Sequence, residues 1–222
     1  IFNAPAFFGC FGTFDYIVNG QFSSLKKTEY NAYVTQKMPS LHAMFDNYVV
    51  FKDTVVFANV TGYGDVTAPN VRDFLIQKGM MHEEAQKIFA QIEDSLKEAP
   101  PQPPVRSLIL YNSGLDTVVG YKGDNYEKIY GGGDSVCNSA SPDYVCKVWN
   151  NIECKDWNKN DAVLWSHTPM LHRPEALDKI YEFLTANNNE KSNDNNNILK
   201  YSLIAVCSVA GVLVIVLIVL LV

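Results

Sequence analysis

The sequence predicts an α/β fold, and three observations support that prediction. Residues 105–111 predict a strand in which residues 107–110 are mostly apolar rather than alternating, as expected of a parallel strand that is buried on both faces. Residues 83–97 place apolar side chains three and four positions apart, which predicts an amphipathic helix. Strand-like and helical segments then alternate along the chain, a pattern typical of sheets flanked by helices.

Composition excludes several classes of protein. The chain has 222 residues, and 18 Lys and Arg against 24 Asp and Glu give a formal net charge of −6. A nucleic-acid-binding domain is normally basic, so we expect no nucleic-acid partner. Hydrophobic residues make up 47% of the chain, which is ordinary for a globular protein and argues against general disorder.

The first eighty residues predict strands, one long loop and one short helix. Residues 1–5 resemble the end of a strand that leads into a loop, because proline and small residues interrupt the apolar run. Residues 20–37 are polar without periodicity and predict a loop. Residues 48–58 are rich in Val and Phe and predict one or two strands. Residues 70–78 predict a helix that Gly79 ends.

The predicted helix at 83–97 is followed by a proline-rich connection. Its apolar stripe consists of Ala85, Ile88, Phe89, Ile92 and Leu96. Four prolines between positions 100 and 104 forbid a helix and stiffen the chain there.

The second half of the chain predicts two or three strands and a last helix. After the buried strand at 105–111, residues 117–121 predict an edge strand. Residues 131–134, Gly-Gly-Gly-Asp, predict a sharp turn. Residues 162–165 predict a short strand. Pro174 suits the first turn of a final helix.

The C-terminal segment differs in composition from the rest. Residues 201–222 contain no charged side chain and, as a helix, would span the ~30 Å of a hydrocarbon core. We therefore predict a single transmembrane helix at 200–222. The alternatives are the tail of a GPI signal, cleaved near Ser192, and a buried core helix. An Asn-rich linker, residues 186–199, would separate this anchor from a body at 1–185.

The cysteines and one sequon indicate an oxidising compartment. Four cysteines precede the predicted anchor and allow three pairings: Cys10, Cys137, Cys146 and Cys154. Asn59, in Asn-Val-Thr, is a candidate glycosylation site. Together with the anchor, these features predict a single-pass membrane protein with a lumenal or extracellular body. Four reduced, buried cysteines are the alternative.

Asp134 and His167 are the candidate catalytic residues. In open α/β sheets, functional side chains gather in loops beyond the carboxyl ends of strands. An Asp followed later by a His fits the Ser, Asp, His chain order of α/β-hydrolases, in which the acid orients the His and the His moves a proton for a serine. Alternatively, Asp134 only forms a turn, His167 caps the last helix, or His172 is the base. No G-x-S-x-G motif occurs in the chain.

Six segments then match the motifs of one family, in chain order. They are residues 1–5, 57–62, 110–117, 131–136, 144–149 and 166–171. These segments resemble the I-x-L-G-A-P-W-G-G, F-x-Y-T-G, L-Y-G-x-G-x-P-T and D-G-D-G-T-V motifs, a Cys- and Trp-containing segment, and the E-H-x-x-M-L loop of lecithin:cholesterol acyltransferases and lysosomal phospholipase A2.

The resemblance implies the C-terminal portion of an α/β-hydrolase fold and acyl chemistry on phospholipids or other lipid esters. It implies Asp134 as the acid, His167 rather than His172 as the base, and a nucleophilic serine upstream of Ile1. It implies a mobile lid at 20–34 and a membrane-associated substrate. No metal and no cofactor are expected.

Two departures from the family pattern favour an alternative. The glycines after the first strand are replaced by bulkier residues, and the family cysteine that pairs with the equivalent of Cys146 would lie near Ile109, which is not a cysteine. Cys146 would then pair with Cys137, Cys154 or Cys10, or stay free. The alternative function is a catalytically inactive surface protein that keeps the fold for binding.

Overall fold

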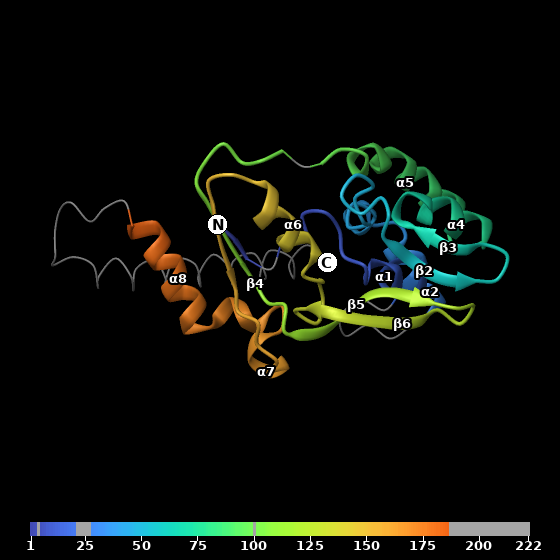
Figure 1. Cartoon of the computed structure of the whole chain (residues 1–222). Coiled ribbons are helices and arrows are strands. Elements are labelled where there is room, and N and C mark those ends of the chain that lie inside the picture. The colour runs from blue at the N-terminus through green and yellow to red at the C-terminus, as the bar shows by residue number, and fades with distance from the viewer. Residues whose placement is uncertain (4, 21–27, 100, 187–222) are drawn as a thin grey trace, which may run out of the picture. The chain divides into compact units, whose positions relative to one another are not determined.

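The computed structural model describes residues 1–3, 5–20, 28–99 and 101–186, and it divides into two compact units (Figure 1). The first unit is residues 1–170 and the second is 171–222. In the second unit, the described residues form helix α8, Pro174–Thr185, which begins at Pro174 as predicted. The candidate site lies in the first unit.

Three parallel strands form one sheet of the first unit, in the order β1 (Phe2–Asn3), β4 (Ser107–Tyr111) and β7 (Ile152–Asp156). All five residues of the central strand β4 are buried, as its apolar sequence predicts. Because the strands are parallel, the chain leaves β4 and β7 at the same edge of the sheet.

Four strands form the other sheet, in the order β3 (Gly64–Thr67), β2 (Val55–Val60), β5 (Leu115–Lys122) and β6 (Glu127–Gly133). The β5–β6 hairpin, yellow-green in Figure 1, lies beside β2, with which β5 pairs in parallel. Leu115 of β5 is the register partner of Gly133 of β6. The start of β5 and the end of β6 therefore lie at one end of the hairpin, next to Asp134.

Short helices connect these strands. Those of the first half are α1 (Thr13–Asn19), α2 (Glu29–Thr35), α3 (Pro39–His42), a 3₁₀ turn (Ala68–Asn70), α4 (Val71–Gln77) and α5 (Glu83–Leu96). Those of the second half are α6 (Ala140–Val148), α7 (Ala162–Trp165) and a 3₁₀ turn (Pro169–His172). Helix α6 packs against β4 and β7.

An aromatic cluster fixes helix α1 against the second sheet. Phe57 of β2 and Tyr121 of β5 are register partners, and their rings stack with centroids 5.3 Å apart. Phe14 of α1 lies 4.8 Å from the first ring and 4.6 Å from the second. All three side chains are buried, so the hydrophobic effect and ring geometry together hold this layer.

The mixed α/β structure is consistent with the predicted fold class, and several predicted elements are present. Helices α4 and α5 occupy the predicted ranges, and Gly79 follows α4 with a φ of 67°, a conformation that glycine adopts without strain. The predicted loop at 20–37 nevertheless contains α2, which the Thr28 side chain caps by accepting a hydrogen bond from the Asn31 amide.

Three local predictions are wrong. Residues 117–121 belong to β5, which lies inside its sheet rather than at the edge. Residues 131–133 are extended and end β6 instead of forming a turn. Residues 162–165 form helix α7 rather than a strand, because the Asp161 side chain accepts hydrogen bonds from the Val163 and Leu164 amides and caps a helical turn.

The predicted transmembrane helix needs correction. Across residues 1–3, 5–20, 28–99 and 101–186, no helix is both long and apolar enough to cross a membrane. The predicted span at 200–222 falls outside these residues, as do residues 187–199 of the linker and 21–27 of the lid. The described residues form a mixed α/β structure, and the fold class with an anchor and the single-pass localisation are corrected to that statement.

Candidate active site

Asp134 lies directly after β6, in a loop that closes around its own carboxylate. The side chain is 3% exposed. Its Oδ1 accepts hydrogen bonds from the amides of Val136 at 3.0 Å and Cys137 at 2.7 Å. The Asp134 amide donates to the Cys137 carbonyl at 3.1 Å. One carboxylate oxygen is thus committed to the loop backbone, which sets the direction in which Oδ2 points.

Close packing explains the glycine before Asp134. A Cβ on Gly133 would lie 2.5 Å from both the Cys137 carbonyl oxygen and Thr117 Oγ1, so a side chain does not fit there. The next residue, Ser135, has a φ of 75°, and its amide donates to Thr117 Oγ1 at 2.8 Å. A serine in this left-handed conformation carries backbone strain, a feature that concentrates at functional sites. Gly133 thus allows the close packing of this loop, although residues 131–133 are extended and do not form the predicted turn.

His167 meets the second oxygen of this carboxylate. Its Nδ1 lies 2.7 Å from Asp134 Oδ2, and its backbone amide donates to the Asp134 carbonyl at 2.9 Å. The His167 side chain is 32% exposed, whereas its partner is buried. The structure therefore brings the two predicted catalytic residues together, 33 positions apart in sequence, and leaves Nε2 to exchange a proton with another group.

The electrostatics of the pair suit an acid that assists a base. The hydrogen bond to Asp134 raises the pKa of His167 above its ordinary value of 6.5, and the carboxylate charge acts in the same direction. Partial burial opposes this rise because it disfavours the imidazolium. The carboxylate thus stabilises the protonated histidine that forms whenever His167 accepts a proton.

Asn112 holds the segment that carries His167 through hydrogen bonds. It is not among the candidate residues predicted from the sequence. It follows β4 directly and is 1% exposed. Its Nδ2 donates to the carbonyls of Trp165 at 3.1 Å and Lys159 at 2.9 Å, and its Oδ1 accepts from the Lys159 amide at 2.7 Å. The signal that could have found it is its position, a polar residue immediately beyond the carboxyl end of a buried strand.

His172 is the alternative candidate for the base. His172 is exposed and belongs to the second unit, in the 3₁₀ turn that follows the site segment. Its predicted role as an alternative base finds no support in a contact like the one that His167 makes with Asp134.

Cys146 and Cys154 form a disulfide that joins α6 to β7. Cys10 and Cys137 are free and buried. The candidate glycosylation residue Asn59 lies in β2 with an exposed side chain, which is compatible with modification. Glycosylation itself stays a prediction.

Three groups near the site could in principle hold a metal ion. One ligand atom each of Asp134, Cys137 and His167 lies within 4.8 Å of the others. However, Asp134 Oδ1 already accepts two amide hydrogen bonds and Oδ2 faces Nδ1 at hydrogen-bond distance. The arrangement therefore matches an acid–base pair better than a metal centre.

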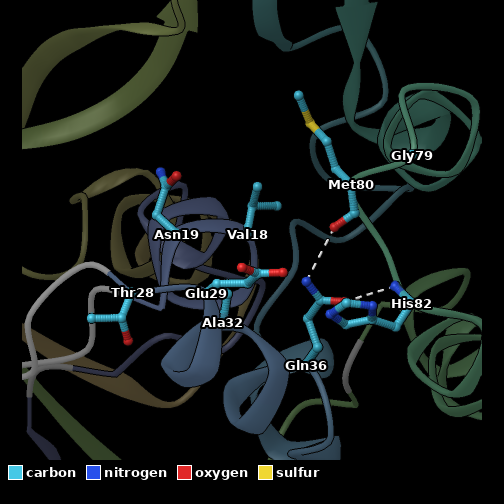
Figure 2. A pocket seen from close by; sticks show the side chains of 9 residues that line it. All are labelled: Val18, Asn19, Thr28, Glu29, Ala32, Gln36, Gly79, Met80 and His82. Carbon is cyan, nitrogen blue, oxygen red and sulfur yellow. Dashed lines mark hydrogen bonds between the residues drawn. The ribbon is translucent and has the colours of Figure 1, made fainter.

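A pocket of about 550 Å³ lies elsewhere in the first unit, and neither Asp134 nor His167 lines it (Figure 2). Gln36, which directly follows α2, lines one side of it: its Nε2 donates to the Met80 carbonyl and its Oε1 accepts from the His82 amide. Thr28, Glu29 and Ala32, which belong to the predicted lid range, line this pocket.

Comparison with known proteins identifies no family: no protein-family model and no curated protein sequence matches the chain.

Proposed function

We propose that this chain supplies the acid and the base of a serine-type lipid acyl-ester hydrolase or O-acyltransferase. The observation that carries the proposal is the 2.7 Å contact between His167 Nδ1 and the buried carboxylate of Asp134. A carboxylate that is held by backbone amides and directed at Nδ1 is the geometry by which an acid orients a catalytic imidazole.

In this proposal each residue has one role. His167 Nε2 takes the proton of a serine hydroxyl, and the serine oxygen attacks the ester carbonyl of the lipid. The imidazolium, stabilised by Asp134, returns its proton to the departing alcohol and leaves an acyl-enzyme. Water or an alcohol then gives a proton to His167 and attacks the acyl-enzyme. His167 returns this proton to the serine oxygen as the fatty acid or the new ester leaves. The serine is proposed to lie upstream of Ile1.

The resemblance to the acyltransferase and phospholipase family supports the substrate class. The disulfide bears on the resemblance itself. The family's partner cysteine would lie near Ile109, in β4. Cys154 of β7 is the register partner of Ile109, and it is bonded to Cys146. The disulfide to α6 thus starts from β7, the strand next to β4, at the position that pairs with Ile109.

Labelling with a fluorophosphonate tests the proposal. The protein is expressed from its complete coding sequence, and its reaction with the probe is followed together with phospholipid ester turnover. We expect a labelled serine and turnover that falls by at least about a thousandfold in His167→Ala. The matched control, His172→Ala, is expected to retain near wild-type rates.

Two outcomes would overturn the proposal. One is a folded protein that neither reacts with the probe nor turns over lipid ester, which would favour a binding protein instead. The other is an equal loss of activity in the two histidine variants, which would show that His167 has no special role.

A further inference from the structure

Two buried thiols meet beside the candidate site and take no part in the proposed mechanism. Cys10, in the loop before α1, is 1% exposed, and Cys137, in the loop that holds Asp134, is 5% exposed. The Cys10 thiol donates to the carbonyl of Val136 at 3.0 Å, and Val136 is the residue directly before Cys137.

Backbone contacts hold both cysteines in place. The Cys10 amide donates to the Met44 carbonyl at 2.9 Å, and the Cys10 carbonyl accepts from the Thr13 amide at 2.9 Å. On the other side, the Cys137 amide and carbonyl both bond to Asp134. The fold around both residues therefore places the Cys10 thiol against the loop that carries Cys137.

The surroundings disfavour a thiolate at this place. The hydrogen bond with Cys10, burial and the charge of Asp134 all raise the pKa of the Cys137 thiol. The carboxyl of Asp46 is also buried, and burial together with Cys10 raises its pKa well above the ordinary value. A reactive cysteine needs the opposite, an electropositive and accessible setting, so neither thiol is suited to nucleophilic catalysis. An uncharged disulfide suits an acidic, buried position better.

We propose that Cys10 and Cys137 form a second disulfide, which the chain acquires while it folds by exchange with a low-molecular-weight disulfide such as oxidised glutathione. The Cys146–Cys154 bond already requires oxidising conditions during folding, and the same conditions act on this pair. Since both native thiols are buried, oxidation belongs to the stage before the pair is buried.

The exchange is balanced in two steps. The thiolate of one cysteine attacks oxidised glutathione, forms a mixed disulfide and releases one reduced glutathione as the leaving thiolate. The other cysteine loses its proton to solvent and attacks the protein sulfur of that mixed disulfide. This step forms the Cys10–Cys137 bond and releases the second glutathione. Two protein thiols are oxidised, and one glutathione disulfide is reduced to two thiols.

The bond would join two parts of the first unit that are far apart in sequence. It would connect the loop after β1 to the loop that carries Asp134, and the enclosed stretch of chain exceeds one hundred residues. A cross-link over so long a loop restricts the unfolded chain strongly. It would also hold the Cys137 amide that donates to Asp134 Oδ1.

Peptide mapping without reduction tests this inference. The full-length protein is refolded in a glutathione redox buffer, its free thiols are alkylated, and its peptides are identified by mass spectrometry. We expect a peptide containing Cys10 joined to one containing Cys137, beside the Cys146–Cys154 pair. Alkylated Cys10 and Cys137 in folded protein whose Cys146–Cys154 bond has formed would overturn the inference, as would a bond from either cysteine to another partner.

A second measurement does not depend on mapping. The double variant Cys10→Ser, Cys137→Ser is expected to melt about 5 to 10 °C below the oxidised wild type, and to lose most of the wild type's response to mild reduction. Equal melting temperatures would count against the bond. Neither measurement uses catalysis. A result against the disulfide therefore leaves the proposed enzyme activity intact, and a result against that activity leaves the proposed disulfide intact.

Discussion

The acid and the base of the candidate site are positioned in different ways. Asp134 is held mainly by its own loop, because the Val136 and Cys137 amides donate to its carboxylate. His167 makes its side-chain contact with Asp134, and Asn112, 55 positions before it in sequence, fastens the segment in front of it. The acid side is thus a local structure, whereas the base side is held by long-range contacts.

This difference predicts which substitutions change the chemistry of the site and which change its geometry. A local loop forms as soon as its few residues adopt the right backbone conformation, so its geometry survives small changes elsewhere. A segment that is held by long-range hydrogen bonds depends on the packing of other elements. We therefore expect substitutions on the acid side to act on the chemistry, and substitutions around Asn112 to act on the placement of the base.

The largest effect is expected from Asp134→Asn, which keeps the shape of the acid but removes its charge. The amide no longer stabilises the imidazolium and favours the wrong tautomer of His167, so kcat for lipid ester turnover should fall by about 10⁴-fold. The matched control is Asp116→Asn, at an exposed position of β5. A loss of less than tenfold in the first variant, or an equal loss in both, would contradict the proposed role of Asp134.

A smaller effect is expected from Asn112→Ala, which removes the hydrogen bonds to Trp165 and Lys159. The displaced His167 should lower kcat by about 10- to 100-fold, because small misplacements of catalytic groups have effects of that size. Asn125→Ala, in the exposed turn of the β5–β6 hairpin, is the control.

The pH profile separates placement from general destabilisation. If Asn112 positions the base, the pKa of His167 in the variant falls back toward 6.5, because the imidazole leaves Asp134. A variant that loses activity with an unchanged pH profile would show that Asn112 supports only the stability of the fold.

The same contrast explains how much of the site could be predicted from the sequence. Asp134 stands out because three glycines precede it, and His167 stands out through the motif around it. Asn112 has only its position after a buried strand as a signal, and the hydrogen bond from Cys10 to Val136 has none. The partners Lys159, Trp165 and Val136 lie 47 or more positions away in sequence, and the tertiary fold brings them close.

The fold shows a similar division. Helix α5 could be predicted because its apolar stripe repeats with the helical period. Strand β7 was not predicted, because its sequence Ile-Glu-Cys-Lys-Asp has only two apolar residues and no apolar run, and none of its residues is fully buried. The apolar residues 162–165 look like a strand in sequence, but the Asp161 cap makes them a helix.

The smallest expected effect is on the pH dependence of stability. Because Asp134 raises the pKa of His167, the charged pair contributes its full stabilisation below about pH 6.5, the ordinary pKa of histidine, and loses it as the pH rises through the raised value. The difference in unfolding free energy between wild type and Asp134→Asn should therefore be larger at about pH 6 than at about pH 9. The change should be modest, since the imidazole is 32% exposed and solvent screens the pair. Urea unfolding at the two pH values measures it, and a difference that grows toward alkaline pH would show that His167 is not the proton acceptor facing this carboxylate.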